Sequence, residues 1–408
     1  RSDSLLLDTL NIHQLQEVVI KGMLPNTRLK GNAMVTRITG SVLEKAGTAN
    51  DVLRRVPGII KKGEDLEVIG RGKPVYYING RKVYDGDELK RLMSDEIANV
   101  EVITNPGAAY DATVSAVVRI KTVRRQGDGF GFGLFGKSEQ SLRTGTNDPE
   151  LQLNANYRYK GVDFFASAKE WRYTTHQWSD LGQWTSDPTT GEELFRYGGT
   201  LDYKWRGIGT HLNTGFNWQI NDNHSLGAKV DYSVTTDADT RERLDMTKYD
   251  HGTLSETVKS DGTKWSDRPD NILANAYYNG NAGKLNIDFN TDVYINNDNT
   301  HQSTKEIATA DNREVESVST SKNQMVATKL VLTYPIAKGM LSIGTEETFV
   351  RRDNDDRSTG TGLPDARSKV KDDTYAAFVQ YAMALGDNTH ITAGLRYEHA
   401  GFDYRDCI

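Results

Sequence analysis

Throughout the C-terminal part of the chain, apolar and polar residues alternate one by one over long stretches. In KLNIDFNTDVYIN, for example, Leu285, Ile287 and Phe289 fall on one parity, whereas Asn286 and Asp288 fall on the other. A period of two is that of a β-strand, whose successive side chains point to opposite faces. The alternation recurs in ELQLNANYRY, SLGAKVDYSV and ITAGLRYE. This part of the chain is therefore predicted to form long antiparallel strands with one apolar and one polar face.

Turn signals separate these strands at regular intervals. Short turns alternate with long polar segments, and the short turns recur about every 50 to 60 residues. The polar segments 235–269 and 351–373 are predicted to be loops. One strand before the first short turn, and two around each of five short turns, give about eleven strands. The five turns are Lys160-Gly161, Asn221 to Asn223, Asn279 to Gly283, Ala337 to Gly339 and Gly386 to Asn388.

Three features are typical of an outer-membrane β-barrel. The connections are short at one end of the strands and long at the other end, and aromatic residues lie near the short turns. The mean hydropathy is −0.62 and 37% of residues are hydrophobic. Helical membrane spans are excluded, because they need about 18 consecutive apolar residues. A barrel is not excluded, because only alternate residues face lipid. A soluble β-sandwich would explain the alternation but not the regular difference in connection length.

Residues 36–125 have a different pattern, in which short strands and short helices alternate. Thr48 and Asp51 have the spacing of a capping box at a helix start. Asn79-Gly80 between two β-runs predicts a tight hairpin, because both turn positions need positive φ. A second short helix is expected in DGDELKRLM, residues 85–93.

The stretch VEVITNPGAAYDATVSAVVRIKT, residues 100–122, begins and ends as a strand and contains a loop of small residues. Val102, Ile103, Val118 and Ile120 are expected in the interior of this N-terminal domain. The helical signals disappear after Gln126, so a second domain is expected to begin there.

Other kinds of chemistry have little support in the sequence. The net charge of −6 and the lack of a basic block give no reason to expect a nucleic-acid partner. The eight histidines show no ligand spacing, and a single cysteine excludes a cysteine-based metal site and an internal disulfide framework. No nucleophile elbow is present. The chain is therefore not expected to be an enzyme, and no cofactor or metal is expected.

Five segments resemble the motifs of TonB-dependent outer-membrane receptors, and they occur in the same order along the chain. They are DVLRRVPGI, GRGKPVYYINGRKV, VEVITNPGAAYDA, VVRIKT and AGLRYE. The resemblance covers nearly the whole chain. It implies a mainly β fold with a flexible segment over residues 1–35, a small α/β plug domain over 36–125, and antiparallel up-and-down outer-membrane β-barrel strands over 126–408. A barrel that needs a plug has about 22 strands. The roughly eleven strands expected here therefore imply an open half-barrel, in a chain that is truncated about half-way through the barrel.

The resemblance also implies sites. LQEVVIKG looks like a TonB box, and its captured residues would be Gln16, Glu17, Val18, Val19 and Ile20, which suit β-strand addition to periplasmic TonB. An ordinary plug strand is the alternative. The residues of the plug motifs are Arg71, Gly72, Asn79, Gly80, Glu101, Asn105, Pro106, Tyr110 and Asp111.

Arg71 is singled out because a charge buried between plug and barrel needs a partner. Acidic residues on the polar parity of the strands offer such partners, for example Asp231, Asp288, Glu346 and Glu398. A solvated Arg71 is the alternative.

The implied function is that of a receptor in the outer membrane of a Gram-negative cell. It would contact outer-membrane lipid and bind an extracellular nutrient ligand, and TonB would energise the uptake. The nutrient would be a chelated metal, an oligosaccharide or a peptide. The alternative is a plugged-barrel surface adhesin or assembly protein without transport, which would have no use for a TonB box.

Overall fold

A computed structural model describes residues 23–30, 32–63, 65–83, 89, 92–111, 113–123, 128–309, 311–359, 364–386 and 389–406. The chain divides into two compact units. The first contains residues 1–106 and 114–124, and the second contains residues 107–113 and 125–408. The predicted domain bounds stay predictions. In the described ranges no helix is both long and apolar enough to cross a membrane.

The first unit is an α/β unit with a six-stranded sheet of order β1-β2-β7-β8-β5-β6. β5 and β8 are parallel, and the other neighbours are antiparallel. β3 and β4 form a separate antiparallel pair. The bounds are β1 Thr27–Lys30, β2 Ala33–Arg37, β3 Ile59–Lys62, β4 Asp65–Val68, β5 Val75–Ile78, β6 Arg81–Lys82, β7 Ile97–Ile103 and β8 Val117–Thr122, with helix α1 Ala49–Leu53 and 3₁₀ turns Val42–Lys45 and Ser94–Glu96.

The core of the first unit confirms the sequence-based expectation. Val102, Ile103, Val118 and Ile120 are each exposed by 2% or less, and they lie on the central strands β7 and β8. Burial of such side chains contributes about 1.5–3 kcal/mol each relative to full exposure. The two apolar runs that flank the small-residue loop are therefore the centre of this unit.

The predicted turn and helix signals of the first unit are confirmed. Thr48 N–H donates to Asp51 Oδ2 at 3.1 Å and Asp51 N–H donates to Thr48 Oγ1 at 3.4 Å, which is a capping box at the start of α1. Asn79 and Gly80 have φ values of +51° and +89° in the hairpin that joins β5 to β6. Most of the predicted second helix, residues 85–93, lies outside the described residues.

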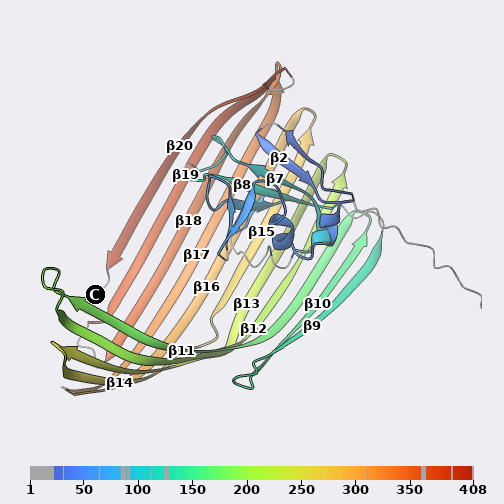
Figure 1. Ribbon diagram of the computed structural model, residues 1–408. Coiled ribbons are helices and arrows are strands. Elements are labelled where there is room, and N and C mark those ends of the chain that lie inside the picture. The colour runs from blue at the N-terminus through green and yellow to red at the C-terminus, as the bar shows by residue number, and fades with distance from the viewer. Residues whose placement is uncertain are drawn as a thin grey trace, which may run out of the picture. The chain divides into compact units, whose positions relative to one another are not determined.

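The second unit contains one large antiparallel sheet of 12 strands, here called the wall (Figure 1). The bounds of its strands are β9 Gly129–Gln140, β10 Asn147–Tyr159, β11 Val162–Ser186, β12 Glu193–Asn221, β13 His224–Asp250, β14 Thr253–Ser266, β15 Asp270–Ala282, β16 Leu285–Ala308, β17 Asn312–Ile336, β18 Gly339–Thr359, β19 Ala366–Leu385 and β20 Thr389–Asp406.

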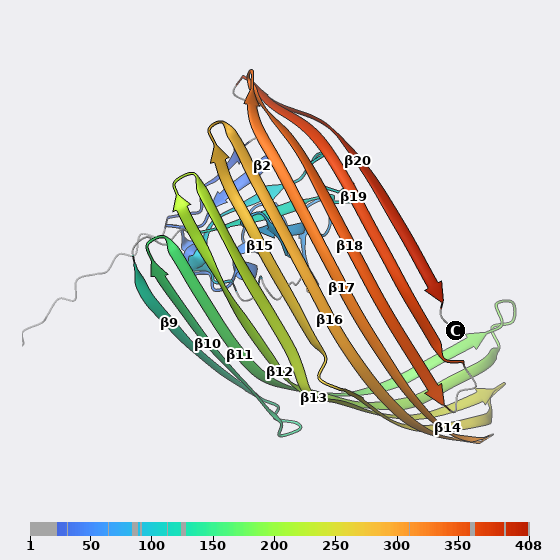
Figure 2. The same ribbon diagram turned by 180° about the vertical axis from the view of Figure 1, so that it is seen from behind.

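The wall has eleven strand positions, because β14 and β15 together occupy one of them. Both pair with β13 on one side and with β16 on the other. Residues 267–269 interrupt this position, and the β12–β13 register shifts at the same level, between Arg206 and Ile208. Irregularities of this kind bend a sheet, and the far halves of β11 to β14 turn away from their near halves (Figures 1 and 2).

The open edges agree with the predicted half-barrel. In the described part of the chain, β9 pairs only with β10, and β20 pairs only with β19. The strands between them follow each other around the sheet in chain order, which is the up-and-down arrangement expected. The prediction of a mainly β fold is confirmed.

The predicted long polar loops are wrong. Most of residues 235–269 lies in β13 and β14, and most of residues 351–373 lies in β18 and β19. β12 reaches 29 residues, whereas about 9–11 residues suffice to cross a bilayer. Beyond the membrane both faces of a sheet meet water, so a polar segment can stay in the ladder without an apolar face. Side chains such as Arg243 and Asp261 pair across the strands there.

Cross-strand register separates two faces of the wall. Phe289, Leu330 and Ile343 lie on the face that is predicted to contact lipid, because residues opposite each other in the ladder point the same way. Asn290 and Lys329 are paired on the other face, here called the polar face. On β16 the apolar parity ends at Ile295, and on β17 it runs from Tyr334 to Val326, about the length of a bilayer crossing. This stretch is called the apolar band.

Candidate functional site

The loop between β7 and β8, residues 107–113, belongs to the second unit, although both flanking strands belong to the first. Local hydrogen bonds shape it. Tyr110 N–H donates to the Gly107 carbonyl oxygen at 3.3 Å, and Thr113 N–H donates to Asp111 Oδ1 at 2.7 Å. Gly107 has φ +75°, a conformation that glycine adopts without cost from a Cβ. Two residues of the predicted plug motif, Tyr110 and Asp111, therefore take part in the structure of this loop.

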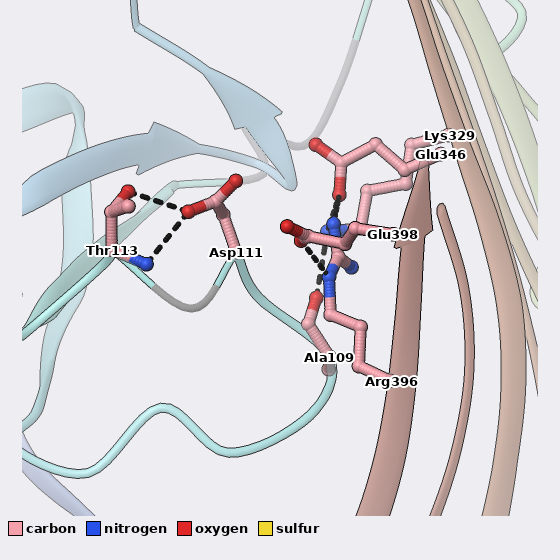
Figure 3. Close-up of polar contacts among 7 residues, drawn as sticks. All are labelled: Ala109, Asp111, Thr113, Lys329, Glu346, Arg396 and Glu398. Carbon is pink, nitrogen blue, oxygen red and sulfur yellow. Dashed lines mark hydrogen bonds and ion pairs between the residues drawn. The ribbon is translucent and has the colours of Figure 1, made fainter. Parts of the chain in front are cut away.

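Four charged side chains gather on the polar face beside the loop (Figure 3). They are Lys329 of β17, Glu346 of β18, and Arg396 and Glu398 of β20. The ladder brings them together, because Lys329 is directly opposite Glu346, and Ala376 of β19 is opposite both Glu346 and Glu398. The small alanine side chain leaves the space through which charges on β18 and β20 meet.

Ion pairs join these four side chains. Glu346 Oε2 lies 3.2 Å from Lys329 Nζ and 3.3 Å from Arg396 Nη2. Arg396 Nε also donates to Glu398 Oε1. The Arg396 side chain is only 9% exposed, so its charge would be costly without these carboxylates. Two cations and two carboxylates make the group neutral as a whole.

Lys329 joins the wall to the loop. Its Nζ donates to the Ala109 carbonyl oxygen at 2.8 Å (Figure 3). The same atom lies 5.0 Å from the centre of the Tyr110 ring. The distance to the ring is that of a cation–π contact. We call Ala109, Tyr110, Lys329, Glu346, Arg396 and Glu398 the wall clasp. The loop contributes a backbone oxygen and an aromatic ring to the clasp, and the wall contributes all of its charges.

A second polar cluster lies on β12 and β13. Asp231 Oδ1 accepts from Asn213 Nδ2 at 2.5 Å, lies 3.3 Å from His211 Nε2, and Oδ2 lies 2.9 Å from Lys229 Nζ. Register places these residues on the same polar face as the clasp. This face of the wall is thus built from hydrogen-bonded and charge-paired groups.

The acidic residues proposed as partners of Arg71 already have partners on the wall. Asp231, Glu346 and Glu398 contact wall cations, and Asp288 Oδ1 accepts from Asn279 Nδ2 at 3.3 Å. The Arg71 side chain is exposed, and its carbonyl oxygen accepts from Ser115 Oγ at 2.7 Å. The pairing of Arg71 with a wall carboxylate stays a prediction.

Other residues of the plug motifs have structural partners within the first unit. Asn79 Nδ2 donates to Thr122 Oγ1 at 2.8 Å, so the hairpin is tied to β8. Glu101 is 7% exposed and lies 3.1 Å from Lys121 Nζ. The remaining members contribute backbone groups or turns: Gly72 and Gly80 have positive φ, and the Asn105 carbonyl oxygen, next to Pro106, accepts from Asn32 Nδ2. The TonB-box candidates Gln16 to Ile20 lie outside the described residues.

Sequence reasoning missed the cations of the clasp. Lys329 stands in TKLVLTY and Arg396 stands in GLRYE, where each is the charged residue on the polar parity of an otherwise ordinary strand. The sequence did contain a signal for these two residues, because a cation on the polar parity of a strand needs a nearby carboxylate or carbonyl group. Which carboxylate it meets depends on strands far away in sequence, and only the register decides that.

Residues 277–406, which contain all four charged residues of the clasp, match the model of the "Outer membrane protein beta-barrel family". The match covers β16 to β20 and part of β15. The protein is therefore located in the outer membrane, as predicted, and contact between the apolar band and lipid stays a prediction. The matched family agrees with the resemblance to TonB-dependent receptors. No curated protein matches the sequence.

Solved structures with similar arrangements include three iron-chelate transport proteins. The ferric yersiniabactin uptake receptor FyuA from Yersinia pestis is 12% identical, with 91% of this chain and 72% of that chain covered and a TM-score of 0.33. The ferric citrate transporter FecA is 13% identical, with coverage of 91% and 70% and a TM-score of 0.34. The ferric enterobactin receptor PfeA from Pseudomonas aeruginosa is 9% identical, with coverage of 92% and 78% and a TM-score of 0.34.

Proposed function

We propose that this protein is an outer-membrane receptor for TonB-energised uptake of a nutrient. The observation that carries the proposal is the division of the loop from its own strands. Residues 107–113 group with the wall, whereas β7 and β8 belong to a separate α/β unit with its own core. A barrel wide enough for transport needs a plug, and a small unit with a complete core of its own suits that role.

The chemistry of the clasp supports a plug that can be released. The loop's bond to Lys329 is a single charge-assisted hydrogen bond with an accompanying ring contact, worth about 1.5–3 kcal/mol. Water can replace the Ala109 carbonyl as a partner of Lys329, and Glu346 stays beside the lysine. The wall therefore keeps its charge balance when the loop leaves.

Energy for release would come from TonB on the periplasmic side. We assign its capture to Gln16, Glu17, Val18, Val19 and Ile20, whose backbone groups suit β-strand addition. The ligand would be a chelated metal, an oligosaccharide or a peptide taken from outside the cell. A surface adhesin or assembly protein without transport is the competing outcome.

A deletion strain tests the proposal when it is grown on single nutrient sources. The panel contains ferric chelates, oligosaccharides and peptides, each supplied alone, with the whole protein restored from a plasmid. Growth and uptake of a radiolabelled source are expected to depend on the restored protein for one nutrient class. Binding to cells without uptake for every class would favour the adhesin and contradict the proposal.

A Val18→Pro variant tests the TonB step. Proline removes a backbone donor that strand addition needs. Uptake is expected to fall to the level of the deletion strain, while ligand binding to whole cells survives. The matched control is a Val18→Thr variant, which keeps the backbone donor and should keep uptake. If binding and uptake fall together in Val18→Pro, the segment has a structural role instead.

A further inference from the structure

On the lipid-facing side of the wall, cations gather just beyond the end of the apolar band. On β17 the apolar band ends at Val326, and Lys322 follows two positions later on the same parity. On β18, Phe349 is followed directly on that parity by Arg351. Lys369 and Lys371 of β19 and Arg405 of β20 lie on the same face of the wall. We call Lys322, Arg351, Lys369, Lys371 and Arg405 the basic patch.

Two pairs of cations in the patch are directly opposite each other in the ladder. Arg351 is opposite Lys371, and Lys369 is opposite Arg405. Like charges at such positions destabilise a sheet. The arrangement therefore has a cost that a bound anion would remove.

Nearby carboxylates offset only part of the patch's charge. Asp373 is shared between Arg351 and Lys371, with Lys371 Nζ at 3.3 Å. Asp353 lies 3.5 Å from Lys369 Nζ, and it also lies 3.9 Å from Arg367, which adds a further cation. Arg405 pairs with Asp403 at 3.0 Å. Four of the five cations of the patch thus contact three carboxylates, and a positive surplus remains.

The patch surrounds a hollow in the surface. Its volume is about 430 Å³, and all five cations of the patch line it, together with Gln324, Asp353 and Asp403. This is within the range of sites for small polar ligands, which is about 300–1,000 Å³. The hollow can therefore receive a group of the size of a phosphorylated sugar.

The other half of the wall differs at the equivalent level. On β12 to β14, Arg206 is directly opposite Asp239, and Arg243 is directly opposite Asp261. Each of these cations has a carboxylate across the ladder. One opposed pair of cations occurs there as well, Lys204 with Arg241, whereas β18 to β20 place two opposed pairs at neighbouring positions of β19.

We infer that the basic patch binds the phosphate groups of a phosphorylated glycolipid in the outer leaflet of the outer membrane. The patch adjoins the apolar band, and the Phe349 and Tyr375 rings, 5.5 Å apart, lie at that border, where aromatic residues mark the membrane surface. Longer excursions of barrel strands lie on the extracellular side, so the patch meets the outer leaflet. Lipid phosphates there would accept charge-assisted hydrogen bonds from the patch. The inference rests on the outer-membrane location and not on uptake.

Binding of purified lipid to the whole protein in a non-ionic detergent tests the inference. The probes are diphosphorylated lipid A, the same lipid A with both phosphates removed, and inorganic phosphate alone. Native mass spectrometry counts the bound lipids and gives the affinity. The wild-type protein is expected to bind the diphosphorylated lipid and to lose it as the salt concentration rises.

Three variants separate charge from fold. Lys322→Ser/Lys369→Ser/Lys371→Ser is expected to weaken binding of diphosphorylated lipid A about 100-fold, since each cation near an anionic lipid surface contributes a factor of about five. The corresponding triple arginine variant should keep binding. The matched control, Arg206→Ser/Arg243→Ser/Lys259→Ser, removes three cations of the same lipid-facing parity from β12 to β14, each directly opposite a carboxylate, and should leave binding unchanged.

Several results would overturn the inference. Equal binding of dephosphorylated lipid A would show that the acyl chains alone are recognised. Displacement of the lipid by inorganic phosphate at equal concentration would indicate a site for a free anion. Absence of lipid binding by the wild type, or equal loss in the patch variant and the matched control, would also contradict it.

Discussion

Lys329 Nζ lies 2.8 Å from the carbonyl oxygen of Ala109, a residue 220 positions earlier in the chain (Figure 3). This contact links the loop between β7 and β8 to the wall. The same ammonium group pairs with Glu346 at 3.2 Å. Lys329 therefore belongs both to the wall's own charge network and to the loop's attachment, and these two roles can be separated by substitution.

The first prediction concerns Lys329→Met, which keeps most of the side chain's length and removes its charge. The loop loses its charge-assisted hydrogen bond and the cation–π contact, so local opening should become easier by about 1.5–3 kcal/mol. Hydrogen exchange followed by mass spectrometry should show faster exchange in a peptide that contains residues 107–113. Lys322→Met on the opposite face of the same strand is the control, and equal exchange in both variants would contradict the assignment.

The second prediction compares the two carboxylates of the clasp. Glu346 contacts both Lys329 and Arg396, whereas the ion pair of Glu398 is with Arg396. Glu346→Gln removes the carboxylate that Lys329 and Arg396 share, whereas Glu398→Gln removes a contact of Arg396 alone. Glu346→Gln should therefore lower the thermal unfolding temperature in detergent more than Glu398→Gln does. The difference is expected to be about 1–2 kcal/mol, below the 3–5 kcal/mol for a fully buried pair, because the Glu346 side chain is 24% exposed. A larger effect of Glu398→Gln would show that Arg396 depends mainly on Glu398.

The third prediction concerns Gly107. An alanine there would adopt φ +75° and would place its Cβ 2.7 Å from Gln380 Oε1. The backbone strain should cost about 1–2 kcal/mol, and displacement of the glutamine adds to it. Gly145→Ala is the matched control, because Gly145 has φ +70° and no atom within 4 Å of the added Cβ.

Adding Gln380→Ala to Gly107→Ala separates the two costs. Relief of the contact should bring the double variant close to Gly145→Ala in its thermal unfolding temperature, since only the strain from positive φ remains. If Gln380→Ala does not improve Gly107→Ala, the glutamine side chain moves aside freely and the contact carries no cost.

The fourth prediction concerns the pH dependence of the first unit. Hydrogen bonds from the backbone and side chain of Thr48 hold the pKa of the Asp51 carboxyl below its ordinary value of 3.8. A lowered folded pKa means that the stabilising contribution is fully present above pH 3.8 and is lost as the pH falls through the folded pKa. Hydrogen exchange of residues 49–55, corrected for intrinsic rates, should show this loss.

Two variants check the source of that pH dependence. Thr48→Ala removes the side-chain half of the capping box and should destabilise α1 by about 1 kcal/mol at neutral pH. Asp51→Asn should flatten the pH dependence of the helix. Asp95→Asn, a change in the first turn of a different short helix, is the control. An unchanged acid dependence in Asp51→Asn would assign it to another carboxyl group.

Local sequence determined much of this protein. The capping box and the Asn79-Gly80 turn form from residues next to each other, so their geometry follows from side-chain chemistry that no distant contact needs to supply. The alternation of apolar and polar residues determined the faces of the strands, because a strand's period of two is a property of its backbone. The count of eleven strand positions followed from the turns in the same way.

The tertiary structure decided what depends on distant partners. Polar segments such as 235–250 were predicted to be loops, yet cross-strand pairing keeps them in the sheet, since backbone hydrogen bonds to a neighbouring strand do not need an apolar face. Register alone placed Arg396 beside Glu346, two strands away. The hydrogen bond from Lys329 to the Ala109 carbonyl oxygen likewise joins residues that no local pattern around the loop could connect.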